Sequence, residues 1–218
     1  MLPRRPLTCY YNLKETKPTK ESVLTMIKGI LQYAHTLLEE SLQPGDTAID
    51  ATCGNGHDTL FLCQTVGANG HVYAFDIQEQ AITNTAQRLA AAHQTNATII
   101  QDSHANFVNH IPVDRLNRIG GAIFNLGYLP GSDKSVVTKG ESTILALEGI
   151  LEHLKPGGTI VLVVYHGHSG GKTEKDALMH YVRSIDQQIC NVLYYGFVNQ
   201  KNNPPFILAL HKKAHQDH

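Results

Sequence analysis

Two patterns of hydrophobic residues alternate along the chain, one typical of β-strands and one typical of α-helices. Short apolar runs typical of buried strands predict strands at 47–50, 71–76, 97–102, 121–125 and 159–165, and two closing strands near 192–198 and 206–211. Apolar residues at helical spacing predict helices over 22–40, 58–66, 80–93, 105–111, 142–153 and 173–187. This regular alternation indicates right-handed βαβ units and an open, mostly parallel sheet.

The last two strands flank a turn at 200–205, so we expect them to form an antiparallel hairpin. The elements together predict an α/β fold: a doubly wound, mostly parallel seven-stranded sheet that ends in a C-terminal antiparallel hairpin. A chain of 218 residues has room for one such domain. We expect this domain to span 22–213, after an extended arm at 1–21 and before a polar tail at 214–218.

Composition restricts the expected cellular compartment and ligand classes but indicates no particular function. The formal net charge is −1, so no overall basic field indicates nucleic-acid binding, although a local patch would suffice. The four cysteines form no Cys-x-x-Cys pair, which argues against a zinc site and for a reducing compartment. No apolar run approaches the roughly 20 residues that cross a bilayer, and the first residues lack the apolar core of a secretory signal. We therefore expect a cytoplasmic protein without membrane contact.

The loop after the first strand is the first candidate ligand site, because open α/β sheets bind ligands at the carboxyl ends of their strands. Asp50 ends the strand, and Gly54, Asn55 and Gly56 follow before a helix. A third glycine in the register of a dinucleotide site is missing, and Asp58 would repel a pyrophosphate. These acids suit a cationic ligand with an amino-acid head, such as S-adenosylmethionine (SAM), whose sulfonium and ammonium are both positive.

The next two strands also end in acids. Asp76, with Gln78 nearby, is placed to accept hydrogen bonds from both ribose hydroxyls. Asp102 ends the third strand, beside Ser103 and His104, where the exocyclic amine of adenine would be bound. A nicotinamide cofactor and decarboxylated SAM remain the rival ligands.

The fourth strand leads into candidate reaction chemistry. Asn125 and Tyr128 have the spacing of the Asn-Pro-Pro-Tyr motif of amine-methylating enzymes, in which the Asn accepts a hydrogen bond from the target amine. Such acceptors aim the lone pair of the amine at the methyl group. The alternative is an ordinary βα loop in which Asn125 forms the turn.

The loops near this motif supply candidate bases. Asp133 follows it, and Tyr165 and His166 leave the fifth strand on the same face. A histidine is the usual group for moving a proton near neutral pH, although His166 as a turn residue is an equal alternative. We expect no metal site, because His166 and His168 lack a third ligand cluster. The histidines within predicted helices are expected to be solvated; they are His35, His93 and His153.

Five segments carry a family resemblance. They are Asp-Ala-Thr-Cys-Gly-Asn-Gly-His-Asp-Thr at 50–59, Tyr-Ala-Phe-Asp-Ile-Gln at 73–78, Phe-Asn-Leu-Gly-Tyr-Leu-Pro-Gly-Ser-Asp-Lys at 124–134, Val-Val-Tyr-His-Gly-His at 163–168 and Asn-Gln-Lys-Asn-Asn-Pro-Pro-Phe at 199–206. Together they resemble the YtqB-like rRNA methylase family, which includes the MnmM-type tRNA methyltransferases. The likeness extends over about 22–213 and implies a Rossmann-like class I SAM methyltransferase.

The resemblance also implies a reaction: methylation of the amine of 5-aminomethyl-2-thiouridine at the wobble position, in the anticodon region of tRNA. By the same resemblance, the residues that line SAM are Asn55, His57, Asp58, Asp76, Gln78, Ser103 and His104, and those that face the target are Asn125, Tyr128, Asp133, Tyr165 and His166. Two other functions stay open: SAM-dependent methylation of rRNA or of a small-molecule amine, and SAM or RNA binding without turnover. A homodimer is also left open.

Overall fold

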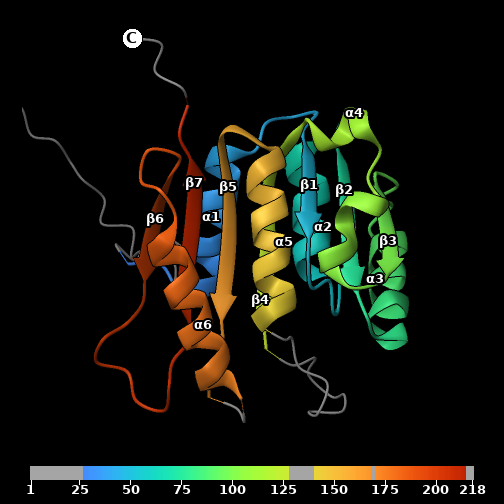
Figure 1. Cartoon of the computed structure of the whole chain (residues 1–218). Coiled ribbons are helices and arrows are strands. Elements are labelled where there is room, and N and C mark those ends of the chain that lie inside the picture. Colours follow the sequence, from blue (N-terminus) through green and yellow to red (C-terminus); the bar gives the residue numbers. More distant parts are fainter. Residues whose placement is uncertain (1–26, 128–139, 168–169, 215–218) are drawn as a thin grey trace, which may run out of the picture.

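The computed structural model describes residues 27–127, 140–167 and 170–214, whose strands build one seven-stranded sheet (Figure 1). The strands are β1 (Thr47–Asp50), β2 (His71–Asp76), β3 (Ala97–Gln101), β4 (Ile119–Leu126), β5 (Leu154–Val164), β6 (Cys190–Tyr195) and β7 (Phe206–Lys212). Their order is β3-β2-β1-β4-β5-β7-β6, and β7 alone among these strands runs opposite to the others. The predicted sheet and its antiparallel C-terminal pair are thus confirmed.

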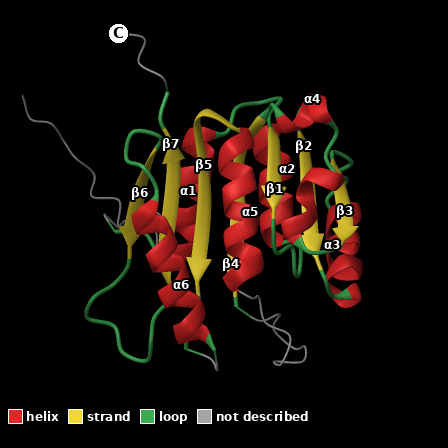
Figure 2. Ribbon diagram, viewed as in Figure 1, coloured by secondary structure: helices red, strands yellow, loops and turns green. Residues whose placement is uncertain are grey.

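Helices cover both faces of the sheet. They are α1 (Ile30–Ser41), α2 (His57–Val66), α3 (Glu79–Ala91), α4 (Val113–Leu116), α5 (Gly140–His153), α6 (Gly171–Ser184) and the 3-10 helix η1 (His104–Asn109). Figure 2 shows α5 and α6 in front of the sheet and α1, α2 and α3 behind it. Within the described ranges, every helix is too short or too polar to span a membrane.

The central strand β5 shows why the apolar run at 159–165 is unbroken. Ile160, Leu162 and Val164 pack in the core shared with α5 and α6. Val161 and Val163 point the other way, into the core shared with α1 and α2. Because neighbouring side chains of a strand face opposite sides, a strand covered on both sides must be apolar at every position.

The first helix is shorter than its hydrophobic pattern predicted. We expected a helix from residue 22, but α1 begins at Ile30, and Gly29 before it has an extended backbone with φ −64° and ψ 161°. Glycine loses more backbone freedom in a helix than any other residue, so the helix starts after it. Residues 22–26 of the predicted helix lie outside the described residues.

The strand predicted at 159–165 starts earlier in the structure: β5 begins at Leu154 and includes 155–158. The pairing of β4 with β5 shifts register between Ile119 and Gly121, and Gly157 takes a left-handed φ of 79°. An irregularity of this kind lets a glycine-containing segment stay in the ladder, where a regular strand would not fit. The short helix α4 was not predicted either.

Candidate active site

The loop after β1 turns sharply and brings the start of α2 against α3. Gly56, which precedes α2, has a left-handed φ of 74°. A Cβ at this position would lie 2.9 Å from the Cα of Thr85 on α3, so only glycine permits this approach. The N–H of Gly54 donates to Oδ2 of Asp76 at 3.1 Å, which ties the loop to the end of β2.

Asp50 lies beneath this loop and is fully buried. Its carboxylate accepts hydrogen bonds from the Thr59 hydroxyl at 2.6 Å and from the Thr52 N–H at 3.2 Å. Burial, and then the negative charge of Asp58, raises the pKa of Asp50 to about 7. Asp50 therefore braces the loop, and a positive ligand nearby would favour its ionised form.

Asp76 and Asp102 end neighbouring strands in different surroundings. Asp76 accepts the N–H groups of Gly54 at 3.1 Å and of Gln78 at 3.0 Å, and each oxygen keeps a lone pair for a ligand hydroxyl. The partners of Asp102 all belong to its own segment: they are the Ser103 N–H at 2.7 Å, Asn106 Nδ2 at 2.9 Å and His110 Nε2 at 2.8 Å. Asp102 thus stabilises the first turn of η1 through these hydrogen bonds. Its predicted contact with adenine stays a prediction.

His104 offers an unused acceptor at the same edge. Its Nδ1 lies 2.9 Å from the carbonyl oxygen of Ala51, which can only accept, so Nδ1 carries the proton. Burial lowers the pKa of His104 and keeps the ring neutral. Nε2 is then an acceptor, buried and without a hydrogen-bond partner among the described residues. An exocyclic amine such as that of adenine is the donor this atom lacks, so the site fits an adenosine group.

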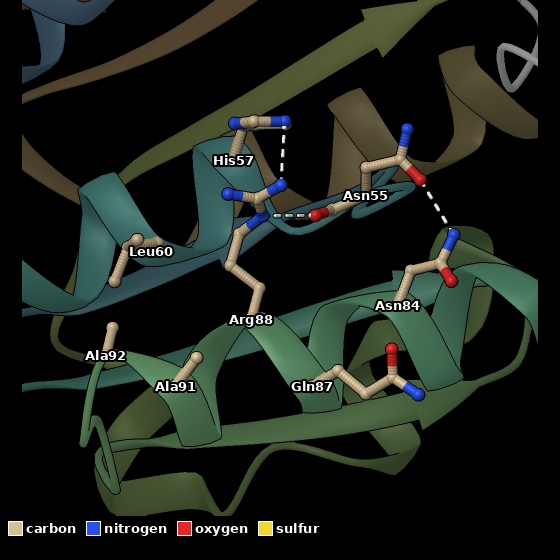
Figure 3. A pocket seen from close by; sticks show the side chains of 8 residues that line it. All are labelled: Asn55, His57, Leu60, Asn84, Gln87, Arg88, Ala91 and Ala92. Carbon is tan, nitrogen blue, oxygen red and sulfur yellow. Dashed lines mark hydrogen bonds between the residues drawn. The ribbon is translucent and has the colours of Figure 1, made fainter.

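Asn55 and His57 are engaged with α3 (Figure 3). Asn84 Nδ2 donates to Asn55 Oδ1 at 2.8 Å, and Arg88 Nε donates to the Asn55 carbonyl at 2.6 Å. Arg88 Nη2 lies 3.0 Å from His57 Nε2. An open groove of about 560 Å³ lies here, lined by Asn55, His57, Leu60, Asn84, Gln87, Arg88, Ala91 and Ala92. Both predicted cofactor side chains therefore make their contacts on the α3 side of the loop.

Asn125 stands at the end of β4, next to the loop that follows β1. Its N–H donates to the Thr52 hydroxyl at 2.7 Å, and its Nδ2 donates to Asp58 Oδ2 at 3.0 Å. Tyr165 lies in the same region, because its N–H donates to the carbonyl oxygen of Leu126 at 2.9 Å, next to Asn125. Burial and then the charge of Asp58 raise the pKa of Tyr165. The fold thus brings together Asn125, Asp58 and Tyr165 from three separate segments.

The remaining reaction candidates are placed only in part. The ring of His166 lies 5.5 Å from that of Phe206. Tyr128, Asp133 and His168 lie outside the described residues. Within the part of the chain that the structure describes, no group of side chains could hold a metal ion.

His35 is a site neighbour that the sequence interpretation missed. We expected a solvated histidine, but His35 Nε2 lies 2.7 Å from Asp58 Oδ1. Its ring stacks on Phe61 with centroids 3.9 Å apart and planes 5° apart. A separation of 23 residues from Asp58 leaves no local signal by which this contact could have been found.

Comparison with known proteins identifies the family of this chain. Residues 72–211 match the protein family described as "Putative rRNA methylase". The chain is 40% identical over 160 residues to the chloroplastic tRNA (mnm(5)s(2)U34)-methyltransferase of Arabidopsis thaliana; the match covers 69% of this chain but only 58% of that protein.

Two solved structures match this chain over nearly their whole length. A "putative rRNA-methylase" from Clostridium thermocellum has a TM-score of 0.82 at 40% identity, over 85% of this chain and 98% of that one. SMU.1697c from Streptococcus mutans, "a putative methyltransferase" in complex with SAH, has a TM-score of 0.78 at 40% identity. The match covers 86% of this chain and 99% of that one. The fold is that of the class I SAM-dependent methyltransferases, and the chain belongs to this rRNA methylase family.

Proposed function

We propose that this protein is a SAM-dependent methyltransferase that methylates the amine of 5-aminomethyl-2-thiouridine at the wobble position of tRNA. The position of Asn125 carries the proposal: its N–H is bonded to Thr52 of the cofactor loop at 2.7 Å, and its side chain stands at the carboxyl end of β4. An amide oxygen there accepts a hydrogen bond from an amine next to the cofactor. The 40% identity of the chain to the chloroplastic tRNA (mnm(5)s(2)U34)-methyltransferase of Arabidopsis thaliana supports tRNA as the substrate.

Residues of the β1, β2 and η1 segments would hold SAM, which supplies an electrophilic methyl group on a positively charged sulfur. Asp76 accepts hydrogen bonds from the ribose hydroxyls. Nε2 of His104, which has no partner among the described residues, accepts one from the adenine amine. The charge of Asp50 favours the cationic end of the ligand. Contacts from Gln78, Ser103 and Asp102 remain predictions of the same kind.

The other side chains act on the target amine. An aminomethyl group is mostly protonated in water and has no free lone pair in that form. Desolvation and the positive sulfonium nearby favour the neutral amine. Asn125 orients that amine by accepting a hydrogen bond from one N–H, so that the nitrogen lone pair points at the methyl group. The ring of Tyr165 packs beside the target, and His166 or Asp133 receives the proton that the nitrogen gives up.

Nucleoside mass spectrometry tests this function directly. Hypomodified tRNA carrying the aminomethyl uridine is incubated with the protein and SAM, beside rRNA and beside tRNA with an unmodified wobble uridine. We expect a gain of one methyl group on the aminomethyl nucleoside alone. Methylation of rRNA instead would contradict the tRNA substrate and make rRNA, as in the family's description, the target. SAM binding without methylation of any RNA would favour a small-molecule amine or a binding module.

A further inference from the structure

The side-chain amide of Asn125 has two ends of nearly equal size but opposite chemistry. The oxygen accepts a hydrogen bond from an amine, whereas the NH₂ group would donate to the lone pair of that amine and block it. In this structure Nδ2 donates to Asp58 Oδ2 at 3.0 Å. A carboxylate only accepts, so this contact leaves Oδ1 on the opposite end of the amide, available to the target.

Asp58 is itself held in place. It lies in the first turn of α2, where the helix dipole favours a negative charge. Its second oxygen, Oδ1, lies 2.7 Å from His35 Nε2 on α1, and its side chain is 13% exposed. The His35 ring stacks on Phe61 of α2, which fixes the direction of Nε2.

We propose that Asp58 and His35 are positioning residues that hold the Asn125 amide with its oxygen toward the target amine. This inference rests on the proposed role of Asn125 as the amine acceptor. A flipped amide would place Oδ1 against the Asp58 carboxylate and lose a charge-assisted hydrogen bond. The carboxylate therefore favours the productive orientation by roughly tenfold to a hundredfold.

The other assignment for Asp58, contact with the ammonium of SAM, makes a different prediction. Both of its oxygens have protein partners, at 2.7 and 3.0 Å. A positioning residue affects turnover once SAM is saturating, whereas a cofactor ligand affects SAM affinity. The two assignments are separable by measuring kcat and the Kd of SAH on the same variants.

Four variants make the test. In Asp58→Asn, His35 Nε2 holds the oxygen of the new amide, so its NH₂ group faces Asn125 and favours the flipped orientation. We expect kcat to fall about threefold to tenfold with the Kd of SAH within about twofold. His35→Phe keeps a ring on Phe61 but loses the nitrogen, and should lower kcat roughly threefold to tenfold. His35→Gln restores a donor to Asp58 and should recover most of that loss. His110→Phe removes the histidine of the other aspartate pair and is the matched control, with kcat within about twofold at saturating SAM.

Two kinetic results would overturn the proposal. One is an unchanged kcat for Asp58→Asn at saturating SAM with a weakened Kd for SAH, which would make Asp58 a cofactor ligand. The other is equal losses of kcat for His35→Phe and His35→Gln, which would show that the hydrogen bond to Asp58 has no role.

A measurement without RNA separates this proposal from the proposed function. In the NMR spectrum of nitrogen-labelled protein, the Asn125 side-chain amide is identified by its loss in Asn125→Ala. One of its protons should be shifted downfield by the carboxylate, and the shift should shrink in Asp58→Asn. A shifted amide in a protein that methylates no tRNA contradicts only the proposed function. An unshifted amide contradicts the positioning role.

Discussion

The described part of the chain contains two histidine–aspartate pairs of nearly the same length in very different places. His35 and Asp58 are 2.7 Å apart, and His110 and Asp102 are 2.8 Å apart. The two histidine side chains are also equally exposed, at 31% and 32%. The aspartates differ: Asp58 is 13% exposed and Asp102 33%.

The difference lies in what each carboxylate joins. Asp58 connects α1, α2 and the end of β4, through partners 23 and 67 residues away in sequence. The partners of Asp102 lie within eight residues, on η1 and just after it. An ion-pair distance therefore does not mark a functional group; the elements that the pair connects do.

The largest expected difference between the two pairs is in the amide that each aspartate holds. Asn125→Ala deletes the proposed acceptor and should lower kcat by about a hundredfold or more, because an interaction that orients the reacting amine is lost. Asn106→Ala deletes the amide bonded to Asp102 and should leave kcat within about twofold. Methyl transfer to tRNA at saturating SAM measures both. A collapse of SAH binding in Asn125→Ala would show instead that Asn125 supports the cofactor site.

Replacing the two acids at the strand ends should weaken SAH binding to different degrees. Asp76→Ala removes the proposed ribose acceptor and an anchor of Gly54, so we expect the Kd of SAH to rise about tenfold to a hundredfold. Asp102→Ala should raise it by about threefold at most, because the Asp102 oxygens are engaged within their own segment. Isothermal titration calorimetry gives both values. The reverse order would place the cofactor nearer to β3 than to β2.

A third carboxylate, that of Glu174, shows the effect of burying an acid. Glu174 lies in the first turn of α6, and its Oε1 is buried without a hydrogen-bond partner among the described residues. Burial raises the pKa of Glu174 from 4.5 to about 7. The folded state then binds more protons than the unfolded state between these values, so stability falls as the pH rises from 4.5 to 7.

Glu174→Gln removes this ionisation and should raise the free energy of unfolding by about 1–3 kcal/mol above pH 7. The gain should shrink as the pH falls and vanish below about 4.5, where both versions are neutral. Urea denaturation at several pH values measures it. A gain that did not depend on pH would mean that the carboxylate is not the cause.

The smallest effect is expected at the exposed pair. His110→Phe should lower the free energy of unfolding by less than about 1 kcal/mol near pH 5.5, since solvent screens the pair. The hydrogen bond from His110 is the main cause that lowers the pKa of Asp102, so the contribution should be lost as the pH falls through that lowered value. A larger loss would mean that the Asp102 segment stabilises the fold as strongly as the Asp58 network does.

Much of the fold follows from local patterns. The strands β1, β2 and β7 lie within a residue of their predicted limits, because runs of buried residues bounded by turns carry a local signal. The start of α1 was wrong, since the helical period continues through Gly29 while the backbone there is extended. The predicted start of the fifth strand was wrong because Gly157 and Gly158 locally resemble a turn, although they lie in an irregular part of β5.

The same division applies to the site. By itself, the sequence determined the alternation of elements, the acids at the strand ends, the glycine loop and the position of Asn125. The tertiary structure alone decided that β7 enters between β5 and β6, that Asp102 closes η1, and that His35 reaches Asp58. The physical reason is range: strand and helix signals repeat over a few residues, whereas a side chain finds a partner on another element only once packing has placed the two together.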